Sequence, residues 1–216
     1  MKRVVVPAVS LALFVILTMI PAPVMADSLA AGGSVIPTAV PGSFTSSLTL
    51  LASVTAPFTI SFGALSTSGD GDSWVYRTAG GTLDFLFQVT TNPGSNDQAE
   101  TLSMALFGSF TTDVDYLTGT SVVPASSSRS SDGNIVNFGF VPGFDGGQST
   151  AVLVIETNAT SFTKGLLSIQ DTGNDSVSSF EPTGVPIVAT PEPSGLVMLG
   201  YGLLGLAGLR RRTLTA

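Results

Sequence analysis

Short segments in which apolar and polar residues alternate recur along the middle of this chain, separated by residues typical of turns. Residues 58–62 read Phe-Thr-Ile-Ser-Phe, which places every second side chain on one face of an extended strand. The same period puts Leu83, Phe85, Phe87 and Val89 on one face. Further strand-like segments span residues 47–54, 74–76, 101–110, 120–123, 135–141, 150–157, 165–170 and 176–180. This succession predicts an all-β fold of about nine or ten short strands.

Many short strands bury their apolar faces most simply when two sheets pack together, so we expect an antiparallel β-sandwich that is Ig-like or jelly-roll-like. Residues 125–133 are expected to form a serine-rich loop, and residues 28–47 an irregular lead-in. Turns are expected where Gly, Asp, Asn and Pro gather, at residues 66–73, 92–96, 142–148 and 171–174.

Residues 1–26 have the composition of a secretory signal peptide. Two basic residues precede an apolar stretch over residues 4–20, and prolines then interrupt it. Val24 and Ala26 supply small residues at the −3 and −1 positions before Asp27. The pattern predicts a signal helix that is removed by cleavage between Ala26 and Asp27, with an uncleaved anchor as the alternative.

Three features follow one another at the C-terminus: Pro191-Glu192-Pro193, a charge-free apolar run over residues 194–209, and Arg210-Arg211-Arg212. A helix over the apolar run could enter a bilayer because it satisfies its own backbone hydrogen bonds, and arginines hold the following end on the cytoplasmic side. The run is shorter than the roughly 20 residues of a comfortable span. We therefore expect a single transmembrane helix that is held briefly and then removed. A buried amphipathic helix would need a polar face, which this run lacks.

This C-terminal pattern over residues 191–216 resembles the PEP-CTERM sorting signal of exported proteins in exopolysaccharide-producing Gram-negative bacteria. The resemblance implies that an exosortase, a membrane-embedded cysteine protease-transpeptidase, cuts near Pro191, Glu192 and Pro193. It also implies transit through the general secretion machinery, transient residence in the inner membrane, and a final location in the envelope, on the cell surface or outside the cell. Four residues follow the arginines here, where many members of the family stop sooner.

The part between the two signals, residues 27–190, is long enough for one domain with its own core. It holds three cations and 14 acidic residues, a net charge of −11, so it lacks the basic surface that nucleic acid binding needs. The chain has no cysteine, which excludes a lipid anchor on cysteine and disulfide bonds, so packing alone must stabilise the domain.

The absence of histidine and cysteine excludes the common nucleophile–histidine systems and the usual zinc sites. Carboxylate chemistry remains, because a glycosidase needs two acids across a sugar. Asp113 with Asp115, or Asp84 with Glu156, could supply such a pair. Acids near turns usually serve solvation or capping, so we expect no catalytic residues and no enzyme.

Two kinds of binding site are weaker candidates. Asp70 and Asp72, or Asp171 and Asp175, offer oxygens that Ca²⁺ accepts, although a turn explains the same residues and no other cofactor is expected. Trp74 and Tyr76 fall on one face of a strand, where they could stack on a sugar or belong to the core.

Taken together, the sequence predicts an exported structural protein of the cell surface or extracellular matrix, sorted by an exosortase. The alternative is a carbohydrate-binding or adhesive module, with exopolysaccharide as a candidate partner. A secreted carboxylate-dependent glycoside hydrolase is the third hypothesis.

Overall fold

The computed structural model describes residues 27–119 and 121–184, which form β-strands with one short 3-10 helix, η2 (Gly42–Ser47). The predicted all-β, mainly antiparallel fold is confirmed. The predicted signal helix (1–26), the sorting motif, the apolar run and the arginine cluster (191–216) lie outside the described residues. Nothing helical within 27–119 or 121–184 is both long and apolar enough to cross a membrane.

Seven strands form the first sheet, in the order β1-β8-β11-β6-β5-β4, with β3 also pairing with β8. All pairs are antiparallel except β3 with β8. The strands are β1 (Asp27–Ser28), β3 (Thr38–Val40), β4 (Thr49–Phe62), β5 (Leu65–Arg77), β6 (Leu83–Thr91), β8 (Thr112–Leu117) and β11 (Leu153–Thr157).

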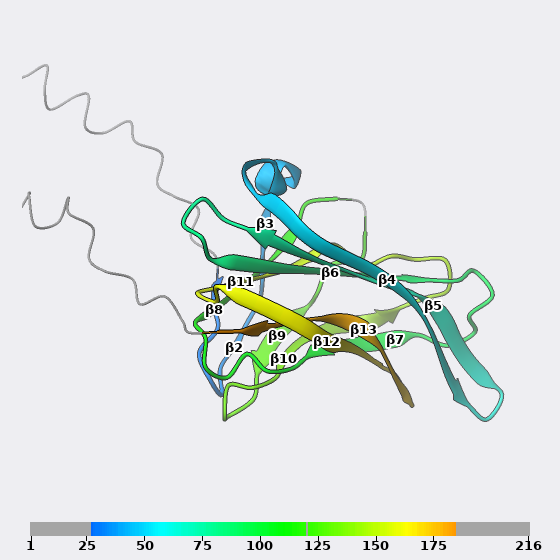
Figure 1. The fold of residues 1–216 in the computed structure, drawn as a ribbon. Coiled ribbons are helices and arrows are strands. Elements are labelled where there is room, and N and C mark those ends of the chain that lie inside the picture. Colours follow the sequence, from blue (N-terminus) through cyan, green and yellow to red (C-terminus); the bar gives the residue numbers. More distant parts are fainter. Residues whose placement is uncertain (1–26, 120, 185–216) are drawn as a thin grey trace, which may run out of the picture.

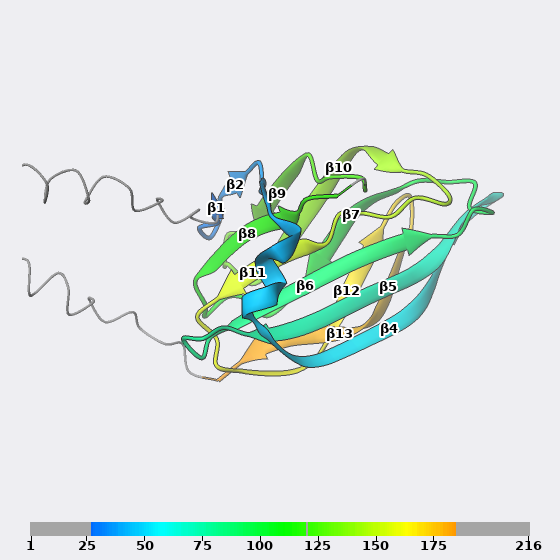
Figure 2. The ribbon, with the colours of Figure 1, turned by 90° about the horizontal axis from the view of Figure 1, so that it is seen from above.

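Six strands form the second sheet, in the order β13-β12-β7-β10-β9-β2, with every pair antiparallel. They are β2 (Ser34–Val35), β7 (Ala99–Met104), β9 (Ser126–Arg129), β10 (Val136–Phe144), β12 (Ser161–Gln170) and β13 (Asn174–Thr183). In Figure 1, β4, β5 and β6 lie above β12, β13 and β7, and Figure 2 shows the same strands from above.

One main hydrophobic core takes side chains from both sheets. Leu83, Phe85, Phe87 and Val89 of β6 are fully buried in it, which confirms the alternation predicted for this segment. The second sheet contributes residues such as Leu102, Met104, Phe138, Leu167 and Ile169. Because alternate side chains of each strand point inward, the intervening residues are left on the two outer faces.

The turn predicted over residues 66–73 is wrong, because these residues lie inside β5. Their glycines serve close packing. A Cβ at Gly69 would overlap the carbonyl oxygen of Thr90 on β6, and a Cβ at Gly71 would lie 2.8 Å from Cγ2 of Val177 on β13. The chain reverses earlier, at Gly63, whose φ of 63° suits glycine.

Two smaller predictions also fail. Residues 126–129 of the expected serine-rich loop form β9, pairing with β10 and β2. In the expected strand over 120–123, Val122 forms only an isolated bridge to Thr150, and residue 120 is outside the described residues. Polar strand residues carry little local signal, because their pairing depends on neighbours distant in sequence.

Candidate functional site

Four side chains with polar groups form a row across the outer face of the seven-stranded sheet. Tyr76 of β5 is the register partner of Asp84 of β6, Asp84 is the partner of Glu156 of β11, and Glu156 is the partner of Asp113 of β8. Direct antiparallel partners on one face have Cβ atoms about 5 Å apart. The structure therefore brings together the predicted pair Asp84 and Glu156, and adds Asp113.

Burial changes the charge of this row. Asp84 exposes only 2% of its surface, and burial, followed by the nearby Glu156, raises its pKa to about 7. Burial and then Asp113 also raise the pKa of the half-buried Glu156. Like charges this close cannot all ionise cheaply, so Asp84 retains its proton well above the usual range of an aspartate.

Asp115 lies two residues beyond Asp113, on the same outer face of β8, and faces Val154 across the strand pair. It exposes 1% of its surface, and neither carboxylate oxygen accepts a hydrogen bond from any described residue. Burial first, then the charges of Glu156, Asp27 and Asp113, raise its pKa to about 7. The backbone N–H of Asp27 lowers the pKa of Asp115, although it does not form a hydrogen bond to either carboxylate oxygen.

The aromatic residues Trp74 and Tyr76 share this outer face, as predicted from their spacing. Both are half-buried and pack against a second, small hydrophobic cluster of Val40, Leu86 and Val154. Phe44 of η2 packs against the same cluster. The segment that leads into β4, visible as the short helix at the top of Figure 1, thus contributes to a small core around the two rings.

Three of the four predicted calcium ligands accept hydrogen bonds within the protein. Asp72 accepts one from Thr55 Oγ1 on the neighbouring strand. The Asp175 carboxylate accepts hydrogen bonds from the backbone N–H groups of Thr59 at 2.9 Å and Ser176 at 2.8 Å. Asp171 accepts one from the N–H of Thr172. In the described part of the chain, no three acidic side chains are grouped so that they could hold a metal ion.

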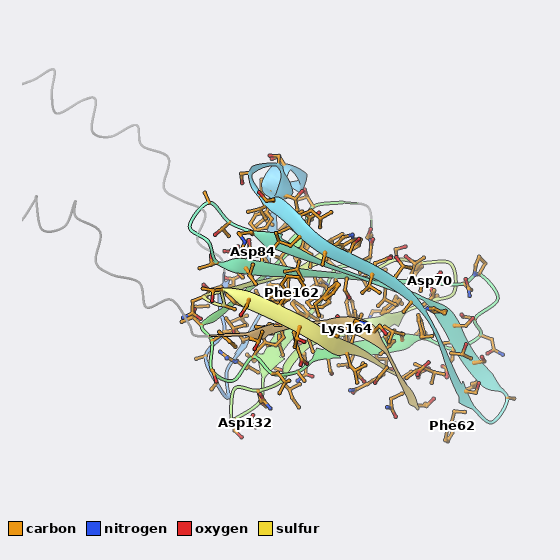
Figure 3. The ribbon with its side chains drawn as sticks, in the orientation of Figure 1. Phe62, Asp70, Asp84, Asp132, Phe162 and Lys164 are labelled. Atoms are coloured by element: carbon orange, nitrogen blue, oxygen red, sulfur yellow. The ribbon has the colours of Figure 1, made fainter. Side chains whose placement is uncertain are left out.

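Figure 3 shows Asp70, an exposed residue of β5, well apart from Asp84 along the same sheet. Asp70 therefore does not belong to the row of acids formed by Asp84, Glu156 and Asp113, the acidic row. Asp27, the residue after the predicted cleavage point, is the first residue of β1.

Sequence reasoning missed Arg129, a buried cation that exposes 8% of its surface. Its guanidinium donates to four backbone carbonyl oxygens: Gly133 at 2.7 Å, Leu29 at 3.0 Å, Phe107 at 2.6 Å and Phe110 at 2.8 Å. Burial lowers its pKa. Arg129 thereby joins the residue that follows β1, the segment after β7 and the loop after β9, which is a structural role.

Sequence reasoning also missed a groove of about 380 Å³ on the outer face of the second sheet. Ser103 Oγ donates to Asn137 Oδ1 at 2.6 Å, and Gln170 Nε2 donates to Ser103 Oγ at 3.1 Å. Ile135 and Leu166 add apolar surface to its lining, and Leu166 is 60% exposed. Only the pairing of β7 with β10 and β12 brings these residues together.

Comparison of the chain with models of protein families, with curated proteins and with solved structures finds no match.

Proposed function

We propose that this chain is an exported structural protein of the cell surface or extracellular matrix, sorted and processed by an exosortase and without catalysis of its own. The processed domain is a β-sandwich of Ig-like or jelly-roll-like kind. The observation that carries the proposal is the position of the folded domain. A continuous core spanning both sheets, from Leu29 to Val177, lies between the predicted cleavage after Ala26 and the Pro191-Glu192-Pro193 motif.

The state of the acidic row supports a non-enzymatic role. A glycosidase presents two carboxyl groups to a sugar in an open cleft. Asp84 and Asp115 are instead covered almost completely, and three grooves among the described residues are lined by other side chains. With a pKa raised to about 7, Asp84 holds a proton inside the protein rather than an oxygen toward a substrate.

The sorting proposal is tested by the intact mass of the protein recovered from the extracellular fraction, in cells with and without the exosortase. We expect a species that begins at Asp27 and ends near Pro193 only when the exosortase is present. Additional mass at that end would indicate covalent attachment to another molecule, which is also consistent with sorting. A tail that runs through Ala216 in both strains would overturn the proposal.

The groove on the second sheet favours glycan binding as a second candidate function. Hydroxyl and amide groups from Ser103, Asn137 and Gln170 can exchange hydrogen bonds with sugar hydroxyls, and Leu166 can contact the apolar face of a sugar ring. Exopolysaccharide from the producing cell is the natural ligand class to test.

The test measures retention of the processed protein on that polysaccharide. Gln170→Ala and Asn137→Ala should each weaken binding if the groove is the site. Trp74→Ala, on the opposite sheet, is the matched comparison and would weaken binding only if the predicted Trp74 and Tyr76 face is the site. Binding unaffected by all three substitutions would remove both versions of this function.

A further inference from the structure

The carboxylate of Asp115 is buried without a partner. Its two oxygens are fully covered, and neither accepts a hydrogen bond in the described part of the chain. Buried polar groups in folded proteins are almost always paired, and a buried carboxylate without a partner opposes folding. This residue therefore calls for a donor, preferably a positively charged one.

The described residues around Asp115 supply no positive charge. Glu156 on β11, Asp113 on β8 and Asp27 on β1 are all acidic and raise the pKa of Asp115. Thr38 on β3 is its register partner, but the Thr38 hydroxyl donates to Asp27 Oδ2 at 2.6 Å. Arg129 is directed to four carbonyl oxygens instead.

One favourable group beside Asp115 is the backbone N–H of Asp27, which lowers the pKa of Asp115. Strand β1 holds this nitrogen in place. Asp27 lies opposite Val114, the neighbour of Asp115, and the N–H of Leu29 donates to Thr112 O at 2.8 Å. From strand β3, the Thr38 hydroxyl donates a hydrogen bond to the Asp27 side chain and fixes its position.

The same nitrogen belongs to the peptide bond that a signal peptidase is predicted to cut. Hydrolysis adds one water across the Ala26–Asp27 bond, leaving a carboxylate on Ala26 and an amino group on Asp27. That amino group binds a proton at neutral pH, because an α-amino group has a pKa near 8. A neutral N–H thus becomes a cation with three donors.

We propose that the α-ammonium group of Asp27, created by removal of the signal peptide, pairs with the buried carboxylate of Asp115 and completes the folded domain. The pair couples export to stability, since the described residues of the uncleaved chain give Asp115 no cationic partner and the processed chain supplies one. The inference rests on the predicted signal-peptide cleavage within the proposed function and is independent of the exosortase.

The experiment compares four exported proteins made from the full precursor: the natural sequence, Asp115→Asn, a form with one glycine inserted between Ala26 and Asp27, and the combination of both changes. Intact mass establishes the first residue of each. The inserted glycine displaces the ammonium group by one residue while every other side chain is retained, so it is the matched control.

In urea unfolding near pH 6.5, Asp115→Asn should lower the folding equilibrium constant about tenfold or more when the protein starts at Asp27. In the glycine-extended protein the same substitution should leave the constant unchanged or raise it. Carboxyl NMR should show Asp115 titrating below pH 4 in the natural protein and near pH 7 in the extended one. This titration requires no substitution at Asp115.

Equal effects of Asp115→Asn in both backgrounds, or an Asp115 that titrates near pH 7 in a protein shown to start at Asp27, would overturn the pairing. A first residue other than Asp27 in the natural protein would remove its premise. Processing at the other end is read from the C-terminal mass of the same sample, so failure of the sorting proposal is distinguished from failure of this one.

Discussion

Asp84 on β6 and Glu156 on β11 are direct partners across two antiparallel strands. Burial and acidic neighbours raise both pKa values, and no positively charged side chain in the described part of the chain lowers either of them. Asp113 extends the row on the other side of Glu156. Two acids in this arrangement reduce their repulsion when one of them keeps its proton, and the more deeply buried Asp84 does so. The stability of the domain is therefore linked to pH.

The first prediction concerns this linkage. The pKa of Asp84 is about 7 in the folded protein and near 3.8 when unfolded, so between these values the folded state binds more protons. Stability contributed by Asp84 should be fully present below about pH 4 and be lost as the pH rises to about 7. Asp84→Asn, which cannot ionise, should raise the free energy of unfolding at pH 8 by up to about 4 kcal/mol and change it little at pH 4.

Urea unfolding across this pH range measures the effect, with Asp70→Asn on the exposed part of β5 as the control. A pH dependence in Asp84→Asn identical to that of the natural protein would contradict the assignment of the proton to Asp84.

The second prediction concerns Arg129. Arg129→Met keeps much of the volume but leaves four backbone carbonyl oxygens without their donor, so it should lower the free energy of unfolding by about 3 kcal/mol or more. Arg129→Lys should recover only part of this loss, because an ammonium lacks the planar fork of donors. Arg77→Met, at an exposed strand end, should stay within about 0.5 kcal/mol. Chemical denaturation of the three variants checks this order of stability. An Arg129→Met variant as stable as the natural protein would refute the prediction.

The third prediction concerns the glycines of β5. Gly69→Ala should destabilise the domain by about 2 kcal/mol or more, because the new methyl group would overlap the Thr90 carbonyl and the β5–β6 pairing must shift. Gly80→Ala, where the nearest atom would be Thr78 Oγ1 at 3.6 Å, should cost much less. Thermal unfolding compares the two, and equal losses would mean that close packing at Gly69 is not the cause.

The fourth prediction concerns the cover over Trp74, the only tryptophan of the chain. Phe44→Ala should remove part of the small hydrophobic cluster, shift Trp74 emission to longer wavelength and increase its quenching by acrylamide. Phe62→Ala is the control, since Phe62 is exposed at the tip of the β4–β5 hairpin, far from the short helix η2 in Figure 3. Unchanged emission in Phe44→Ala would show that η2 does not cover the ring.

The sequence by itself determined the strand character of the chain and much of its inward face. The alternation of Leu83, Phe85, Phe87 and Val89 is local, and it identifies the face of β6 that enters the main core. The turn between β12 and β13, at residues 171–173, follows from equally local preferences for turn residues.

The tertiary structure alone decided the rest, because register relates residues far apart in the chain. Asp84 meets Glu156, and Ser103 meets Asn137 and Gln170, only once the sheets have paired. The glycines of residues 69–72 look like a turn in the sequence, yet they are required by a neighbouring strand and by the facing sheet. Burial of Asp115 and Arg129 likewise depends on what covers them, and burial sets their pKa values and their need for partners.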